Sequence, residues 1–236
     1  REDDRVLAIT RSGTTTEVIN ALERFRAGGG GRPRATVLVA TPGTPVTALA
    51  DDLVLMDDVD ERSTVQTRFA TSVLALLRAH LGHDLAPAAA DAERVLAADP
   101  EPLLGPVLTA GQITFVGGGW TTGLAYEAAL KLREGVRMWT EAYPAMEYRH
   151  GPVSIAEPGR AVWAFGDVPS GLAEEVRATG AHFEHSTADP LAELVRVHRL
   201  CLLRADAAGL DADSPRNLTR SVVLDDRGQD GGGGRS

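Results

Sequence analysis

The sequence has a single cysteine, few aromatic residues, no excess of positive charge and no long apolar run. Because Cys201 stands alone, no disulfide can form within the chain, which fits a reducing cytoplasm, and its leucine-rich neighbours predict a small buried side chain. The formal net charge of −9 argues against nucleic acid as a partner. No apolar run approaches the roughly 20 residues that cross a bilayer. We therefore expect a soluble, cytoplasmic protein with no membrane partner.

Short apolar runs alternate with helical patterns along the 236 residues, which is typical of an α/β fold with parallel sheets. Strands are predicted at 6–10, 36–40, 53–56, 113–116, 161–165 and 182–185. Helices are predicted at 15–26, 67–81, 91–97, 122–137, 172–179 and 191–208, with a short helical turn at 145–149.

Two halves are predicted, because each contains a strand that runs into a small-residue turn and then a helix. The first half covers 1–84 and the second 108–210, with a helical connector at 85–107. A C-terminal tail follows at 211–227, and the glycine-rich 228–236 should be disordered. Three strands and two helices cannot cover both faces of a parallel sheet, so we expect the first half to be N-terminally incomplete.

The most informative segment is 127–150, which holds two carboxylates, a lysine and a histidine on one helix and its exit. Glu127, Lys131 and Glu134 are spaced i, i+4 and i+7, so they project from one helical face. One interpretation is an exposed salt bridge between Glu127 and Lys131. The other is a buried cluster that tunes a carboxylate for proton transfer, and the third charge, Glu134, favours it. His150 precedes Gly-Pro and should lie at a loop.

Two turns are candidate anion sites. Residues 115–120 form a strand end followed by three glycines, which should leave the first amide groups of the next helix open to an anion. Residues 10–16 combine hydroxyl groups, a glycine and a cation at the start of a helix, where phosphate is the natural ligand. The alternative there is N-capping by Ser12 or Thr14, with Glu17 completing a capping box.

The histidine pairs do not predict a metal site. His80 and His83 share the His-x-x-His spacing with His182 and His185, but neither pair has a third ligand at a metal-binding spacing. We therefore expect no metal.

Three separated segments match one family in order. They are Ile-Thr-Arg-Ser-Gly-Thr-Thr-Thr-Glu-Val-Ile at 9–19, the charged segment 127–150 with its following Gly-Pro, and Asp-Ser-Pro-Arg-Asn-Leu-Thr-Arg-Ser-Val at 213–222. Together they resemble the tandem sugar isomerase (SIS) domains of glucosamine-6-phosphate synthases. The resemblance implies a doubly wound, flavodoxin-like α/β fold, a homodimer with a shared active site, no metal or organic cofactor, and a hexose or hexosamine 6-phosphate as ligand.

The resemblance also implies catalytic roles. Glu134 matches the base that moves a proton between C1 and C2 through an enediol, and Glu127 and Lys131 match the network that orders this base. His150 matches the ring-opening residue, which reaches the site from the partner subunit. The lysine that forms a Schiff base with the ketose is replaced by Arg220, whose guanidinium does not readily lose the proton that imine formation requires. Arg220 is instead expected to hold an anion.

The phosphate loop of the family falls on a short segment of this chain, at Thr10, Arg11, Ser12, Gly13 and Thr15. A serine-threonine-lysine stretch expected after the third strand appears at 65–68, where Thr67 and a cation are kept. The opening strand of the family and its glycine-rich turn are not present in this chain.

The aromatic run near His150 favours a dimer, because Trp139, Tyr143, Met146 and Tyr148 would otherwise be exposed. Two functions remain open. One is aldose-ketose isomerisation, or deamination or amination of an amino-sugar phosphate, without a glutaminase domain. The other is non-catalytic binding of a sugar phosphate, by a regulatory module or a truncated inactive product.

Overall fold

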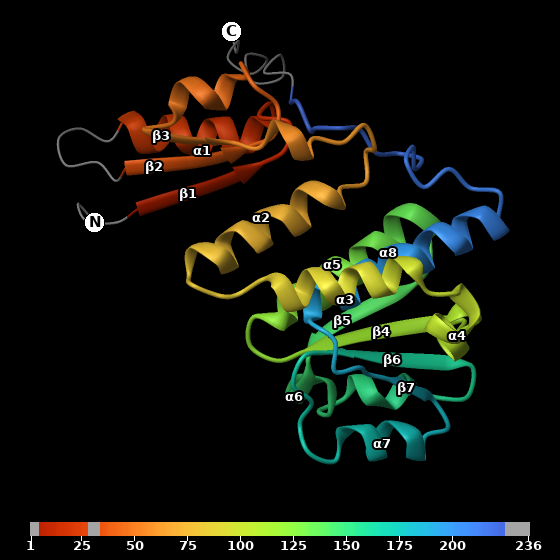
Figure 1. Ribbon diagram of the computed structural model, residues 1–236. Coiled ribbons are helices and arrows are strands. Elements are labelled where there is room, and N and C mark those ends of the chain that lie inside the picture. The colour runs from red at the N-terminus through yellow and green to blue at the C-terminus, as the bar shows by residue number, and fades with distance from the viewer. Residues whose placement is uncertain (1–4, 28–33, 225–236) are drawn as a thin grey trace, which may run out of the picture. The chain divides into compact units, whose positions relative to one another are not determined.

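The computed structural model of the chain describes residues 5–27 and 34–224 (Figure 1). They divide into two compact units, which we call unit 1 (residues 1–74 with 217–236) and unit 2 (residues 75–216). The helical connector predicted at 85–107 falls in unit 2, and most of the predicted tail falls in unit 1. Residues 228–236, for which the sequence predicts disorder, lie outside the described residues.

Unit 1 is built on a three-stranded parallel sheet in the order β1-β2-β3. The strands are Arg5–Thr10, Arg34–Val39 and Asp52–Leu55. Helix α1 (Thr16–Ala27) and the 3₁₀ helix η1 (Pro45–Leu49) cover one face of this sheet, and a second 3₁₀ helix, η2, spans Asp57–Val59.

The two faces of the unit 1 sheet differ in burial. Val6 and Ala8 pack into the core beneath α1, so the alternate residues of β1 point to the opposite face. There Leu7 and Ile9 remain 47% and 45% exposed. An apolar sheet face with exposed side chains agrees with the prediction that two helices are too few to cover the sheet.

Unit 2 contains a four-stranded, all-parallel sheet in the order β5-β4-β6-β7. Helices α3, α5 and α8 cover one face and α6 and α7 the other (Figure 1), which confirms the doubly wound architecture for this unit. The strands are Gln112–Gly117 (β4), Thr140–Pro144 (β5), Arg160–Phe165 (β6) and His182–Glu184 (β7). The helices are Ala86–Ala97 (α3), Pro100–Leu104 (α4), Thr121–Val136 (α5), Ala145–Tyr148 (α6), Leu172–Ala178 (α7) and Pro190–Ala207 (α8), with 3₁₀ helices Gly105–Leu108 (η3) and Pro152–Ile155 (η4). Helix α2 (Arg68–His80) spans the division between the units.

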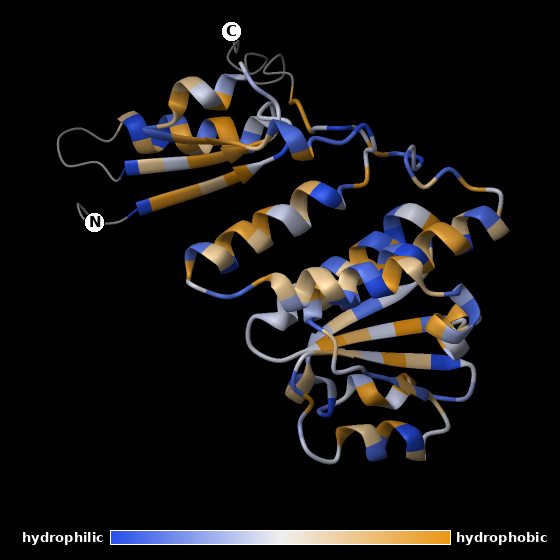
Figure 2. Cartoon of the chain, viewed as in Figure 1, coloured by the Kyte–Doolittle hydropathy of each residue, from blue (hydrophilic) through white to orange (hydrophobic). Residues whose placement is uncertain are grey.

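The core of unit 2 lies against its central strands, which are apolar along much of their length (Figure 2). Every residue of β4 is buried, as expected for a parallel strand covered on both faces. The ring of Phe115 lies 5.9 Å from that of Trp163 and 6.2 Å from that of Phe165, measured between centroids. These aromatic contacts fix β4 beside β6.

Two glycines of unit 2 permit close packing. A Cβ atom on Gly117 would lie 2.4 Å from the carbonyl oxygen of Thr121, so the turn from β4 into α5 leaves no room for a side chain. A Cβ atom on Gly135 would lie 2.3 Å from the Sγ atom of Cys201, so this glycine lets α5 approach α8. Gly117 is therefore required by a tight turn, and Gly135 by the close packing of two helices.

Three predicted elements need correction. Strand β5 is not predicted, because its residues are assigned to the exit from a helix. Its sequence, Thr-Glu-Ala-Tyr-Pro, contains no apolar run. In the structure this segment forms a partly exposed strand at the edge of the sheet. Helix α3 begins at Ala86 instead of residue 91. The prolines at 100, 102 and 106, which the prediction of a single helical connector leaves out, begin two short helices: Pro100 and Pro102 lie in α4 and Pro106 in η3.

Candidate functional site

Unit 1 carries a hydroxyl loop, which we define as residues 10–15, between β1 and α1. Thr10 and Ser12 are buried, and their hydroxyl groups accept hydrogen bonds within the loop. The Gly13 N–H donates to Thr10 Oγ1 at 3.3 Å, and the Thr14 N–H and hydroxyl donate to Ser12 Oγ at 3.3 and 3.1 Å. The hydroxyl groups are therefore gathered at the carboxyl end of a strand, ahead of a helix.

Gly13 is required by the shape of this loop. Its φ of +66° lies in the left-handed region, and a Cβ atom there would lie 2.0 Å from Thr44 Oγ1. Among the described residues, no N–H group of α1 donates to Ser12 Oγ or Thr14 Oγ1, so N-capping by either residue is not observed. Ser12 Oγ accepts from the Thr14 N–H and hydroxyl instead. The amide at the start of α1, Thr16 N–H, donates to the carbonyl oxygen of Val222 at 3.1 Å.

The C-terminal tail lies against the hydroxyl loop. Thr14 Oγ1 is hydrogen-bonded to the Ser221 hydroxyl at 2.9 Å, and the Leu224 N–H donates to Thr16 Oγ1 at 2.9 Å. The buried Arg11 guanidinium donates to the carbonyl oxygen of Arg220 at 3.3 Å and to that of Ser63. Arg11 therefore joins the loop to the tail.

Arg220 is held by a carboxylate that the sequence analysis missed. Its Nη2 atom lies 2.5 and 2.8 Å from the two carboxylate oxygens of Asp60, and its Nη1 donates to the Glu61 carbonyl. Burial alone would raise the pKa of Asp60, but the hydrogen bonds from Arg220 and from the Glu61 backbone outweigh it, so the pKa lies below its usual value. The acidic residues at 57–61 are the sequence feature that could have indicated a carboxylate partner for Arg220. Arg220 is thus engaged with Asp60, whereas the sequence predicts that it holds an anion.

Thr67 is occupied by a capping carboxylate. Glu61 accepts hydrogen bonds from the Thr67 N–H at 3.0 Å, the Thr67 hydroxyl at 3.0 Å and the amides of Arg68 and Phe69. These are the first amides of α2, the groups that an anion would use. The N–H and hydroxyl groups of Thr67, which the resemblance assigns to phosphate binding, therefore donate to the Glu61 carboxylate in this structure.

Unit 2 carries the charged cluster of α5. Lys131 Nζ lies 2.9 Å from Glu134 Oε2 and 3.4 Å from Glu127 Oε1. The Lys131 side chain is 4% exposed, against 21% for Glu134 and 25% for Glu127. This confirms that the three residues share one face, and it favours the buried cluster over the exposed salt bridge. Lys131 is also the only lysine in the chain.

Cys201 packs against the same helix. Its thiol lies 3.4 Å from the carbonyl oxygen of Lys131, and burial raises the pKa of Cys201 to about 11, although the charge of Lys131 acts in the opposite direction. The prediction of a small buried side chain is confirmed.

His150 is exposed in the turn after α6, where its N–H donates to the Glu147 carbonyl at 3.0 Å. Of the aromatic run near it, Trp139 is 76% and Met146 is 52% exposed. The prediction of an exposed Tyr148 is wrong: this side chain is fully buried in the core under α6, and burial raises its pKa to about 12.

The anion site predicted at 115–120 is also wrong. The first amides of α5 are not open, because the N–H groups of Thr121, Thr122 and Gly123 donate to the carbonyl oxygens three residues earlier, at 3.2, 3.3 and 3.2 Å. These are 3₁₀-type hydrogen bonds, and they engage the N–H groups that the sequence predicted to be available to an anion.

Within residues 5–27 and 34–224, no group of three or more His, Cys, Asp or Glu side chains is arranged to hold a metal ion. In the same ranges, no helix is both long enough and apolar enough to cross a bilayer.

Solved structures of known proteins share this fold. A glucosamine-6-phosphate deaminase from Thermotoga maritima matches 95% of this chain and 76% of its own, with a TM-score of 0.76 at 21% identity. A tagatose-6-phosphate ketose/aldose isomerase from Escherichia coli matches 88% of this chain and 70% of its own, with a TM-score of 0.69 at 16% identity. The chain therefore has the α/β fold of the SIS-type phosphosugar isomerases.

Among curated sequences, the chain resembles the isomerase part of glutamine–fructose-6-phosphate aminotransferase. The enzyme of that name from Pyrobaculum aerophilum is 26% identical over 95% of this chain. The chain spans about 44% of the length of that relative. No family model matches the chain.

Proposed function

We propose that this chain binds a sugar phosphate of the hexose or hexosamine 6-phosphate class and catalyses proton transfer between C1 and C2. The reaction is aldose-ketose isomerisation or the deamination or amination of an amino-sugar phosphate. One observation carries the proposal: the Glu134 carboxylate lies 2.9 Å from the buried Lys131 ammonium on helix α5. A carboxylate positioned in this way is suited to take and return a proton.

Glu134 is the proposed base, and Lys131 and Glu127 are its positioning residues. Glu134 takes the proton from the carbon next to the carbonyl while the carbonyl oxygen is protonated, which gives an enediol, and it returns the proton to the neighbouring carbon. His150 is the proposed ring-opening residue and acts across a homodimer in a shared site. Its exposure in the turn after α6 makes it accessible to a second copy.

The hydroxyl loop is the proposed phosphate site, formed by Thr10, Ser12, Gly13 and Thr15. Arg11 positions it through the tail, since its guanidinium reaches two backbone carbonyls. The reaction needs neither a metal nor an organic cofactor, because acid-base groups suffice for enediol chemistry. We further propose that the two units correspond to tandem SIS domains, the first one N-terminally incomplete, and that the protein works in the cytoplasm.

The decisive experiment follows proton exchange in deuterated water, at C2 of glucosamine 6-phosphate and at C1 of fructose 6-phosphate. Glu134→Gln should lower the exchange rate by about 10²- to 10⁴-fold while sugar-phosphate affinity, measured by calorimetry, stays near that of the wild type. Glu93→Gln, an exposed carboxylate on α3, is the matched control and should exchange normally. Equal loss of affinity and exchange in Glu134→Gln would contradict the assignment of Glu134 as the base.

A second candidate function is non-catalytic binding of a sugar phosphate. It is favoured by Arg220, which is engaged with Asp60, and by the absence of any lysine other than the buried Lys131 to form an imine. Binding of fructose 6-phosphate by the wild-type chain without any exchange of its C1 protons would establish this alternative.

A further inference from the structure

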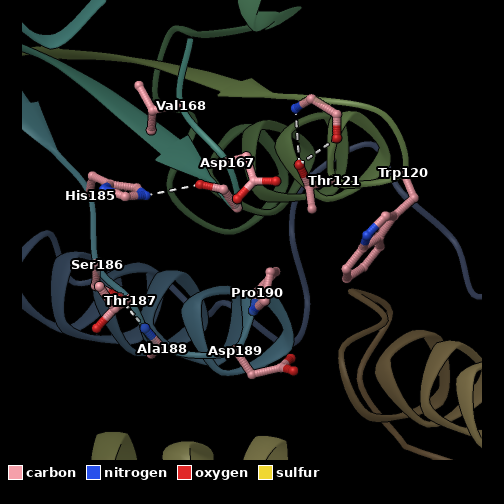
Figure 3. Close-up of a pocket in the computed structure, with 12 residues that line it drawn as sticks. Trp120, Thr121, Asp167, Val168, His185, Ser186, Thr187, Ala188, Asp189 and Pro190 are labelled. Atoms are coloured by element: carbon pink, nitrogen blue, oxygen red, sulfur yellow. Dashed lines mark hydrogen bonds between the residues drawn. The ribbon is translucent and has the colours of Figure 1, made fainter. Parts of the chain in front are cut away.

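Unit 2 contains a pocket of about 650 Å³ that the proposed function does not use. It lies at the carboxyl ends of β4 and β6, where the connections leave toward opposite faces of the sheet, the usual position of ligand sites in doubly wound folds (Figure 3). We call it the β4–β6 pocket. It is lined by residues 118, 120 and 121 after β4, residues 166–168 after β6 and residues 185–190 after β7.

The β4–β6 pocket is not built for an anion. The amides at the start of α5 donate to carbonyl oxygens of the preceding turn. The start of α8 is capped by Asp189, whose side chain accepts from the Leu191 N–H at 2.9 Å. No residue that lines the pocket in the described part of unit 2 is a lysine or an arginine. A phosphate would therefore meet no lysine or arginine side chain among the lining residues, and the first amides of α5 are already engaged.

The lining carboxylates suit hydroxyl groups and a cation instead. Asp189 is neutralised by Arg78, whose guanidinium donates to its two oxygens at 2.8 and 2.7 Å. Asp167 is exposed and forms no ion pair with any residue that the structure describes. The pocket thus carries one uncompensated negative charge, at Asp167. Thr187 adds an exposed hydroxyl group.

Trp120 supplies an apolar wall. The Arg78 guanidinium lies over its ring, 5.2 Å from the centroid, which fixes the indole, and the side chain still remains 52% exposed. In the view of Figure 3, Asp167 lies between Trp120 at one end of the pocket and His185 at the other. His185 Nε2 is hydrogen-bonded to the Gly166 carbonyl at 2.9 Å, a contact that joins the segment after β7 to the segment after β6.

We propose that the β4–β6 pocket binds an unphosphorylated amino sugar. A sugar ring offers an apolar C–H face for Trp120, its hydroxyl groups pair with Thr187, and its ammonium group neutralises Asp167. A phosphorylated sugar is disfavoured here by the charge of Asp167. The inference is independent of the proposed function, because none of the pocket residues belongs to the hydroxyl loop or the charged cluster.

The test is titration of the full chain with glucosamine, followed by calorimetry and by saturation-transfer NMR. Glucosamine should bind, and glucose, which lacks the ammonium group, should bind at least about tenfold more weakly, the scale of one charge-assisted hydrogen bond. Asp167→Asn should weaken glucosamine binding by a similar factor, and Trp120→Leu should weaken it as well. The matched control Glu174→Gln, an exposed carboxylate on α7, should bind like the wild type.

A second arm separates this pocket from the sugar-phosphate site. Ser12→Ala, in the hydroxyl loop, should leave glucosamine affinity unchanged, and saturating fructose 6-phosphate should not displace glucosamine. The proposal is overturned if glucosamine does not bind, if Asp167→Asn with a wild-type melting temperature binds it normally, or if fructose 6-phosphate displaces it. Failure of proton exchange in the earlier experiment would leave these outcomes unaffected.

Discussion

The Sγ atom of Cys201 on α8 lies 3.4 Å from the backbone carbonyl oxygen of Lys131 on α5, so the only thiol of the chain touches the helix turn that carries the charged cluster. The contact is possible because Gly135 has no side chain at the point where the two helices meet. The proposed base, Glu134, therefore sits on a helix whose position depends on a tight helix-helix contact.

Cys201 should be inert toward alkylation in the native protein. It is buried, and its pKa of about 11 keeps the thiol protonated at neutral pH. Iodoacetamide labelling followed by mass spectrometry should be slow in buffer and fast in denaturant. Rapid labelling in buffer at pH 7 would show that the α5–α8 contact opens readily.

Gly135→Ala should destabilise unit 2 by about 1–3 kcal/mol, because the added methyl group overlaps Cys201 Sγ. Gly123→Ala is the matched control on the same helix, where a Cβ atom meets nothing within 4 Å. It should stabilise by about 0.5–1 kcal/mol, the gain in helix propensity of alanine over glycine. Urea unfolding of the two variants measures the contrast, and a stabilised Gly135→Ala would contradict the packing described here.

The wild-type chain should form no imine with a ketose phosphate. Its only lysine is buried between two carboxylates, and the tail carries Arg220 at the position where the resemblance to glucosamine-6-phosphate synthases predicts a lysine. Borohydride treatment with fructose 6-phosphate should leave the wild-type mass unchanged and add one sugar phosphate to Arg220→Lys. Arg94→Lys, an exposed position on α3, is the control and should gain no adduct. An adduct on Lys131 in the wild type would refute this prediction.

Docking of the tail should depend on the Asp60 carboxylate. Asp60→Asn removes the charge that holds Arg220, so amide exchange of residues 217–224 should become faster, whereas the exposed neighbour Asp58→Asn should have no effect. The pKa of Asp60 is lowered in the folded chain, so the stabilisation is present above its usual value of 3.8 and is lost as the pH falls through the lowered one. Tail protection in wild type that disappears already at pH 5 would be inconsistent with this assignment.

The order of strands and helices was largely readable from the sequence, because parallel strands buried on both faces give short apolar runs between helical patterns. The shared face of Glu127, Lys131 and Glu134 follows from helical spacing alone. Strand β5 was not predicted, because this edge strand contains Glu141 and Pro144 and has no apolar run.

Pairing across long sequence distances was not readable. Nothing local in the sequence links Asp60 to Arg220, 160 residues away, or Thr14 to Ser221. The glycine turn before α5 was misinterpreted for a different reason: composition shows that amide donors are available, but only the backbone path shows that Gly118, Gly119 and Trp120 carbonyls accept from them. A loop rich in hydroxyl side chains is easier to predict, because the residue types themselves identify the hydrogen-bonding groups.

The burial of Lys131 determines how the assembly of this protein can be studied. Every other basic side chain in the printed sequence is an arginine or a histidine, so amine-directed cross-linkers and tags find no exposed lysine among these residues. A negative cross-linking result with such reagents would say nothing about whether two copies associate. Carboxylate-directed coupling, or ultracentrifugation without any label, is the informative route to the oligomeric state.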